Sequence, residues 1–166
     1  MMAVSTAPQA AVSVARGMIE ALGLKVDYVA ARNADTLAAR MRLPNISTRE
    51  RAIAIGKTQL GTMYRWGGTT PAGFDCSGFT RYVYSAAGID LPRAADEQYD
   101  VGESVSMANL EPGDLVFFST YEAGISHVGI YIGNHQFINA ASDGVSVSDM
   151  DSSYWSARYV GAKRIM

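Results

Sequence analysis

Residues 74–78 read Phe74-Asp75-Cys76-Ser77-Gly78 and mark the start of an amphipathic helix. Apolar residues then recur at helical spacing, and a glycine that favours a helix stop follows them: Phe79, Tyr82, Val83, Ala86 and Gly88. This pattern predicts a helix over residues 76–87 with Cys76 in its first turn. Unpaired backbone N–H groups and the helix dipole favour a thiolate at that position. The sequence therefore predicts a lowered pKa and a nucleophilic role for Cys76.

The composition is that of an ordinary globular chain. Of its 166 residues, 48% are hydrophobic and 18% are charged, which is enough apolar material for one packed domain. A net charge of -2 and a pI near 5.6 predict that nucleic acid is not a partner. No apolar run in the sequence is long enough to span a bilayer. We expect a monomer that needs no cofactor, and the single cysteine excludes an internal disulfide.

The first part of the chain, residues 1–47, is predicted to be a mainly helical accessory region. Helices are expected over residues 8–22 and 35–41, with a short strand over residues 24–29 between them. Residues 1–15 lack a basic stretch, so we do not predict a signal peptide.

Residues 48–166 are predicted to form the main domain. Ser47 and Glu50 have capping-box spacing ahead of a helix that ends near Gly61. A short polar helix is expected over residues 94–99. Alternating apolar residues and turn residues predict strands over residues 115–118, 127–132, 136–140, 145–150 and 159–165. Because helices precede strands, we predict an α+β fold with an antiparallel sheet.

Two residues of the predicted strands complete a candidate site with Cys76. His127 begins one strand, and imidazole is the side chain that can take a proton from a thiol near neutral pH. Asn139 lies on the next strand, where its amide can accept a hydrogen bond from the other ring N–H. A two-residue turn at Gly133-Asn134 would pair His127 with Ala140, so the contact with Asn139 requires a bulge or a register shift.

Each of these residues also has a purely structural explanation. A free cysteine is usually a small buried hydrophobic residue. A histidine at a strand end is often a hydrogen-bonded structural residue, and His135 is expected to be solvated at the hairpin tip. Asn139 can satisfy a turn or a backbone group. One cysteine and two histidines offer no zinc-binding spacing, so a metal site is not predicted.

Five motifs occur in the order found in one known family. They are Tyr64-Arg65-Trp66-Gly67-Gly68, Phe74-Asp75-Cys76-Ser77-Gly78-Phe79, Leu91-Pro92-Arg93, Glu111-Pro112-Gly113-Asp114-Leu115-Val116-Phe117-Phe118 and His127-Val128-Gly129-Ile130-Tyr131. Together they resemble an NlpC/P60 domain from about Thr48 to Met166. The resemblance implies a papain-like fold, in which the helix with the nucleophile packs on a central antiparallel sheet.

The resemblance also implies catalytic roles. Cys76 would be the nucleophile, His127 the base and Asn139 the third residue, at a place where the family commonly has histidine. Tyr64 would border the cleft, where its hydroxyl and the Cys76 backbone N–H can stabilise an oxyanion. Tyr64 also fits a core aromatic residue.

The resemblance assigns Asp75 and Ser77 to the substrate, because they would face the free amino end of a stem peptide. Asp75 also fits a helix cap. The implied activity is that of a Cys-His-Asn cysteine endopeptidase on bacterial peptidoglycan stem peptides, at the γ-D-glutamyl to diamino acid bond. The implied location is extracytoplasmic: periplasm, cell wall or secreted. Two alternatives stay open, a non-catalytic wall-binding module and a thiol-dependent acyltransferase or amidase.

Overall fold

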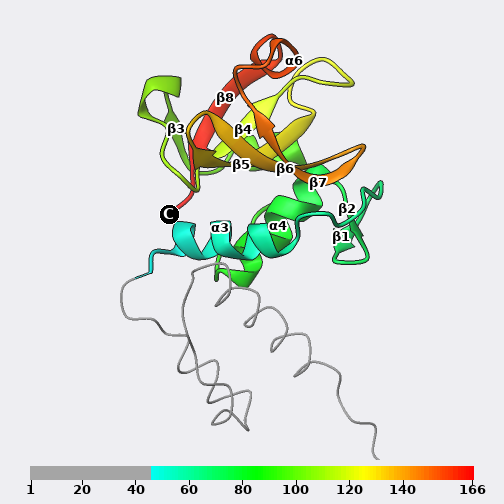
Figure 1. The fold of residues 1–166 in the computed structure, drawn as a ribbon. Helices are drawn as coiled ribbons and strands as arrows, with labels where there is room; N and C mark the ends of the chain where they lie inside the picture. Colours follow the sequence, from blue (N-terminus) through cyan, green and yellow to red (C-terminus); the bar gives the residue numbers. More distant parts are fainter. Residues whose placement is uncertain (1–45) are drawn as a thin grey trace, which may run out of the picture.

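The computed structural model describes residues 46–166 (Figure 1). The elements predicted over residues 8–22, 24–29 and 35–41 lie outside the described residues. The helices are α3 (Thr48–Thr58), α4 (Cys76–Ala86), α5 (Ala95–Tyr99) and α6 (Ser153–Ser156), with a 3-10 turn η2 at Met107–Asn109. The strands are β1 (Thr69–Thr70), β2 (Gly73–Phe74), β3 (Glu103–Val105), β4 (Leu115–Phe118), β5 (His127–Gly133), β6 (Gln136–Ala141), β7 (Gly144–Asp149) and β8 (Tyr159–Arg164).

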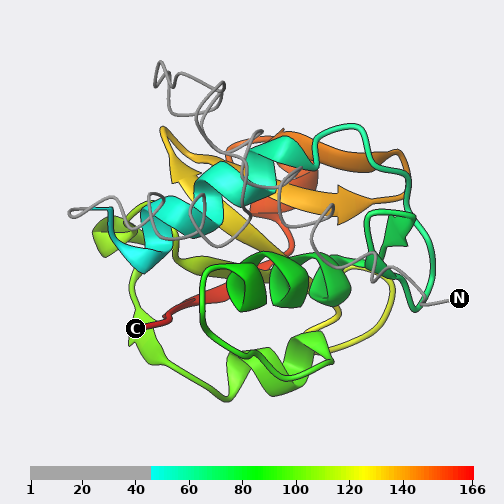
Figure 2. The ribbon, with the colours of Figure 1, turned by 90° about the horizontal axis from the view of Figure 1, so that it is seen from below.

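A six-stranded antiparallel sheet forms the centre, with the strand order β3-β8-β4-β5-β6-β7. Strands β1 and β2 form a separate small hairpin. Helices α3 and α4 cover one face of the large sheet, and α6 lies on the other side (Figure 1). Figure 2, which looks at the molecule from the helix side, shows α3 and α4 lying side by side in front of the sheet. The predicted α+β class is confirmed, and the five predicted strands end within one residue of the observed bounds.

Two apolar cores lie on the two faces of this sheet. The larger core joins the helices α3 and α4 to the sheet and includes the fully buried Phe79 and Val83. The smaller core, on the α6 side, comprises Val116, Phe118, Tyr131, Phe137, Met150 and Ala162, with Trp155 packed against it. Successive strand residues point to opposite faces. Because both faces are covered, all four residues of β4 are buried.

Two helices begin where the sequence predicts. The Ser47 hydroxyl accepts from the Glu50 N–H at 3.2 Å, and the Glu50 carboxylate accepts from the Ser47 N–H at 2.8 Å. The predicted capping box of α3 is therefore confirmed. Asp75 caps α4, because its carboxylate accepts from the Gly78 N–H at 2.7 Å. This cap makes Cys76 the first residue of the helix.

A buried carboxylate joins the last strand to the turn before β4. Asp114, which is 0% exposed, accepts two hydrogen bonds from the Arg164 guanidinium, both at 2.9 Å. It also accepts from the Glu111 N–H at 2.8 Å, and Arg49 of α3 lies 3.5 Å away. These partners offset the large cost of removing a charge from water.

The hairpin of β5 and β6 has a different register from the predicted one. Its turn is Asn134-His135, where both residues have positive φ, 51° and 57°. A bulge lies between Tyr131 and Gly133, and Tyr131 pairs with Phe137. The predicted two-residue turn at Gly133-Asn134 is therefore wrong.

The observed register decides which side chains share a face. Since side chains alternate along a strand, His127 lies on the same face as Tyr131. Asn139 lies on that face too, because Phe137 is the partner of Tyr131. The predicted pairing of His127 with Ala140 is wrong, and the required register shift is present.

Candidate active site

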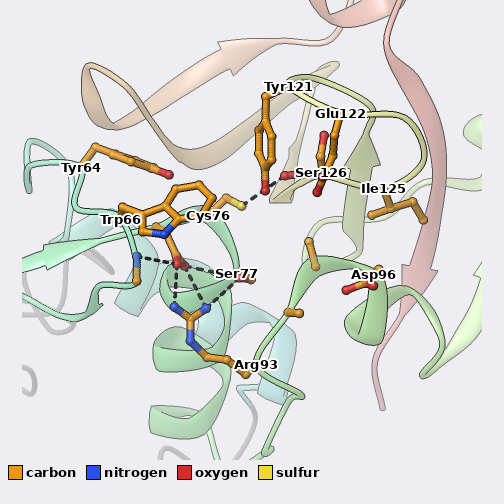
Figure 3. Close-up of a pocket in the computed structure, with 14 residues that line it drawn as sticks. Tyr64, Trp66, Cys76, Ser77, Arg93, Asp96, Tyr121, Glu122, Ile125 and Ser126 are labelled. Atoms are coloured by element: carbon orange, nitrogen blue, oxygen red, sulfur yellow. Dashed lines mark hydrogen bonds and ion pairs between the residues drawn. The ribbon is translucent and has the colours of Figure 1, made fainter.

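Cys76 lies where two cavities meet, because it lines both of them. The cavities have volumes of about 400 and about 630 Å³. Cys76 is 8% exposed as a residue, and its Sγ lies 3.8 Å from the carbonyl oxygen of Ser126. Figure 3 shows the hydroxyl ends of Tyr64 and Tyr121 pointing toward the sulfur. The sulfur is thus buried, yet next to space that a ligand can enter.

His127 lines the larger cavity together with Cys76. Its Nε2 lies 2.9 Å from the Oδ1 atom of Asn139. An amide oxygen only accepts, so Nε2 carries the ring proton and Nδ1 is left as the basic nitrogen. In residues 46–166 no hydrogen bond joins the imidazole to the sulfur, whose partner is the carbonyl of the residue before His127.

A glycine opposite Asn139 leaves room for this contact. A Cβ at Gly129 would lie 3.1 Å from the Asn139 Cβ and 2.6 Å from the Phe137 Cδ2. Contacts that short force neighbouring atoms to move. A side chain at position 129 would therefore disturb the amide that bonds His127.

Aromatic rings enclose the imidazole of His127. Trp155 stacks on it with ring centroids 5.0 Å apart and planes at 29°, and the Phe118 ring lies 6.3 Å away. Burial lowers the pKa of His127 to about 4, although the hydrogen bond to Asn139 opposes the shift. The ring is therefore uncharged at neutral pH.

Burial also raises the pKa of the Cys76 thiol above its ordinary value. Backbone N–H groups near the sulfur, first among them that of Val128, lower this pKa but do not outweigh burial. The expectation of a lowered thiol pKa is therefore wrong for the unliganded protein. A neutral thiol and a neutral imidazole share the larger cavity.

We expect stability to fall on acidification because of His127. Its folded-state pKa of about 4 lies below the ordinary 6.5, so the unfolded chain binds the proton more readily. This contribution is complete above pH 6.5 and is lost as the pH falls through about 4. Between pH 7 and pH 5, the wild type should lose about 2 kcal/mol more stability than His127→Gln. Urea unfolding at both pH values measures this, and equal losses contradict the burial argument.

Asp75 and Ser77 line the smaller cavity but are already bonded within the chain. The Arg93 guanidinium donates to both Asp75 oxygens, at 3.0 and 2.6 Å, and to the Ser77 Oγ at 2.9 Å. Asp75 also accepts from the backbone N–H groups of Gly67 and Gly78. The alternative role of Asp75 as a helix cap is therefore confirmed. Arg93, to which the sequence assigned no role, neutralises its charge.

Aromatic and acidic side chains form part of the remaining walls of the two cavities. Tyr64 lines both cavities, and burial raises its pKa, so its hydroxyl remains a donor. Trp66 is 75% exposed and packs edge to face on Tyr121, with ring centroids 5.9 Å apart. Further lining residues that the sequence did not indicate are Asp96 and Glu122 in the smaller cavity and Asp143, Ser148 and Trp155 in the larger one.

Within the described part of the chain, no three His, Cys, Asp or Glu side chains are grouped to hold a metal ion. None of the helices in residues 46–166 combines the length and apolarity needed to cross a membrane.

A family model described as NlpC/P60 family matches residues 61–164. The chain belongs to the NlpC/P60 family. The NlpC/P60 segment is 49% identical over 112 residues to LytE, a probable peptidoglycan endopeptidase of Bacillus subtilis, covering 68% of this chain and 33% of that protein. The gamma-DL-glutamyl hydrolase of Bacillus subtilis is 43% identical over 141 residues, covering 82% of this chain and 32% of that protein. The chain thus spans about a third of the length of these relatives.

A solved NlpC/P60 structure has the same fold. RipD from Mycobacterium tuberculosis is described as a non-catalytic NlpC/p60 domain protein with adaptation to a peptidoglycan-binding function. It matches with a TM-score of 0.64 and 27% identity, over 74% of this chain and 100% of that chain. The NlpC/P60 fold predicted from the five motifs is confirmed.

Proposed function

We propose that this NlpC/P60 domain is a cysteine endopeptidase that hydrolyses peptide bonds in peptidoglycan stem peptides. The proposal rests on one observation, the cavity that Cys76 and His127 share. In His127 the Nε2 atom bonds Asn139, so Nδ1 is the nitrogen that can accept a proton. The relative LytE, named a probable peptidoglycan endopeptidase, supports the substrate class. Because peptidoglycan lies outside the cytoplasm, we propose an extracytoplasmic place of action.

In the proposed reaction, the thiol proton moves to the Nδ1 of His127 as the Cys76 sulfur attacks the carbonyl carbon. The Cys76 backbone N–H and the Tyr64 hydroxyl stabilise the resulting oxyanion. As the C–N bond breaks, the Nδ1–H group protonates the leaving amine and a thioester remains. Water then gives a proton to Nδ1 as its oxygen attacks the thioester carbon. As the C–S bond breaks, Nδ1–H returns that proton to the sulfur, so the acid leaves and the thiol and the neutral imidazole are restored. Since the Cys76 thiol and the His127 imidazole are both neutral before the reaction, the proton moves to the imidazole as the sulfur attacks.

The position of His127 indicates which cavity holds each side of the cleaved bond. His127 lines the larger cavity and not the smaller one, and the same imidazole must protonate the leaving amine. We therefore assign the amine side of the cleaved bond to the larger cavity and the acyl side to the smaller cavity.

The lining of the larger cavity suits a diamino acid as the leaving residue. Among the described residues 46–166, its lining includes the acidic Asp143 and no lysine or arginine, which favours a side-chain ammonium. The relative named gamma-DL-glutamyl hydrolase supports a γ-glutamyl acyl group. Together these observations support the γ-D-glutamyl to diamino acid bond as the bond cut.

The acyl-side cavity has an excess of negative charge. Asp75 and Arg93 neutralise each other, and Asp96 and Glu122 add two exposed acidic side chains to the lining. This charge favours the free amino end of a stem peptide. We assign the contact with that ammonium to Asp96 and Glu122, because Arg93 and two backbone N–H groups already bond Asp75.

We expect the double variant Asp96→Asn and Glu122→Gln to raise KM about fivefold for stem peptides with a free amino end, because exposed charges contribute modestly. Peptides with an acetylated amino end should show the same KM for variant and wild type. Glu103→Gln removes an exposed acid on β3, away from the cavities, and is the matched control. Steady-state kinetics on defined peptides measure this. An equal rise in KM for acetylated peptides contradicts the assignment of the ammonium contact to Asp96 and Glu122.

Two alternatives use the same fold. A wall-binding module, of which RipD is described as an example, would bind sacculi without releasing amino groups. An acyltransferase would pass the acyl group from Cys76 to an added amine. His127 lines the cavity of Cys76 and is hydrogen-bonded to Asn139, and this arrangement favours catalysis over binding alone.

Incubation of the purified protein with sacculi tests the proposal. New amino groups that accumulate with time support hydrolysis. Sedimentation of the protein with sacculi in the absence of new amino groups contradicts hydrolysis and favours the binding module.

A further inference from the structure

Three polar side chains form a diagonal row across the neighbouring strands β5, β6 and β7. The His127 Nε2 bonds the Asn139 Oδ1 at 2.9 Å, and the Asn139 Nδ2 donates to the Ser148 Oγ at 2.9 Å. Asn139 pairs with Ser146, so Ser148 is its diagonal neighbour on the same face of the sheet. Ser148 also lines the larger cavity together with His127.

The side-chain amide of Asn139 requires a partner that fixes its orientation. The two ends of an amide have nearly the same shape, so packing alone does not decide which end faces the imidazole. Asn139 is 0% exposed, and hydrogen-bond partners therefore decide the orientation. Its Nδ2 has two acceptors, the Ser148 Oγ at 2.9 Å and the Ser146 carbonyl at 3.5 Å. The hydroxyl of Ser148 is the nearer of the two.

We propose that Ser148 is a positioning residue, which accepts from the Asn139 Nδ2 and so directs the Oδ1 to His127. If the amide were reversed, its NH₂ group would face Nε2, which would then have to accept, and the ring proton would lie on Nδ1. An imidazole with its proton on Nδ1 cannot take the proton of Cys76. Ser148 thus selects the tautomer in which His127 is a base. The effect on catalysis rests on the proposed function, whereas the effect on the tautomer does not.

Ser148→Val and Ser148→Thr form a matched pair, because the two new side chains have the same shape and only threonine keeps a hydroxyl. Ser146→Ala is the control on the same strand and face, since it removes a hydroxyl but keeps the carbonyl that Asn139 bonds. The chain has two histidines, and His135 is exposed at the hairpin turn. Nitrogen-15 NMR of histidine-labelled protein at neutral pH therefore reports one buried imidazole.

Wild type, Ser148→Thr and Ser146→Ala should show the Nε2–H tautomer of His127. Ser148→Val should show a larger share of the Nδ1–H tautomer. In the same variant, kcat on stem peptides should fall about fivefold with KM unchanged, as expected for the loss of one buried hydrogen bond. Ser148→Thr should restore the wild-type kcat.

An unchanged tautomer in folded Ser148→Val overturns the proposal, whatever the activity. If the valine variant does not fold, Ser148→Ala gives the same comparison with a smaller side chain. If the wild type cleaves no stem peptide, the proposed function fails, and the tautomer comparison alone then decides the role of Ser148.

Discussion

Cys76→Ala is expected to abolish the release of new amino groups from sacculi and to leave the fold intact. The variant has no sulfur to form the thioester, and His127 has no nucleophile to deprotonate. We expect a loss of at least about 10³-fold in kcat, as for the removal of a nucleophile that acts in a unit. The cost in stability should be small, about 1 kcal/mol, because the thiol borders space that is already open.

Chromatography of digested sacculi measures the activity, and far-ultraviolet circular dichroism checks the fold. Ser85→Ala, on the exposed side of the same helix, is the control and should retain full activity. Hydrolysis by folded Cys76→Ala at the wild-type rate would refute the thiol mechanism.

Asp114→Ala should lower the free energy of unfolding by about 3–5 kcal/mol, the usual cost of removing one partner of a buried ion pair. The substitution leaves the guanidinium of Arg164 without the two hydrogen bonds it makes to the carboxylate. It also removes the acceptor of the Glu111 N–H and the nearby partner of Arg49. Helix α3, the turn before β4 and strand β8 all meet at this carboxylate, so the loss affects the whole domain.

Glu111→Ala is the matched control for this prediction. The Glu111 carboxylate contacts Arg49 and Arg164 at 3.0 and 3.5 Å, yet its side chain is 52% exposed. An exposed pair contributes about 1 kcal/mol or less. Urea unfolding of both variants gives the comparison. Similar losses in the two variants would show that burial of Asp114 is not what makes its ion pairs important.

The position of the thiol could be predicted because local patterns decide it. The apolar spacing after Cys76 and the cap at Asp75 lie within a few residues of each other, and α4 begins where they indicate. The strands were predicted for the same reason. Strands β3 and β1 and helix α6 were not predicted, since they have two to four residues and show too little periodicity.

The register of the central hairpin could not be predicted from residue types. A glycine followed by asparagine favours a turn at Gly133-Asn134. The observed turn instead uses His135 with positive φ, a conformation that histidine adopts less readily than glycine. Because of the bulge before Gly133, every earlier residue of β5 pairs with a residue of β6 that is shifted by one position. The contact between His127 and Asn139 depends on that shift.

The electrostatics of the site depends on residues that are distant in sequence. Asp75 is neutralised by Arg93, which follows it by 18 residues. Trp155 comes from a short helix near the end of the chain and covers His127. Burial raises the pKa of Cys76 and lowers that of His127, whereas the sequence showed only the helix start, which acts in the opposite direction on the thiol.

Mass spectrometry of the products from defined muropeptides tests the central claim most directly. Hydrolysis by Cys76 predicts two fragments whose masses add up to the substrate plus one water, with the new amine on the diamino acid. It also predicts an acyl fragment attached to Cys76 at short reaction times. Intact muropeptide after incubation with folded wild-type protein, or a product joined to an added amine in place of water, would contradict the account.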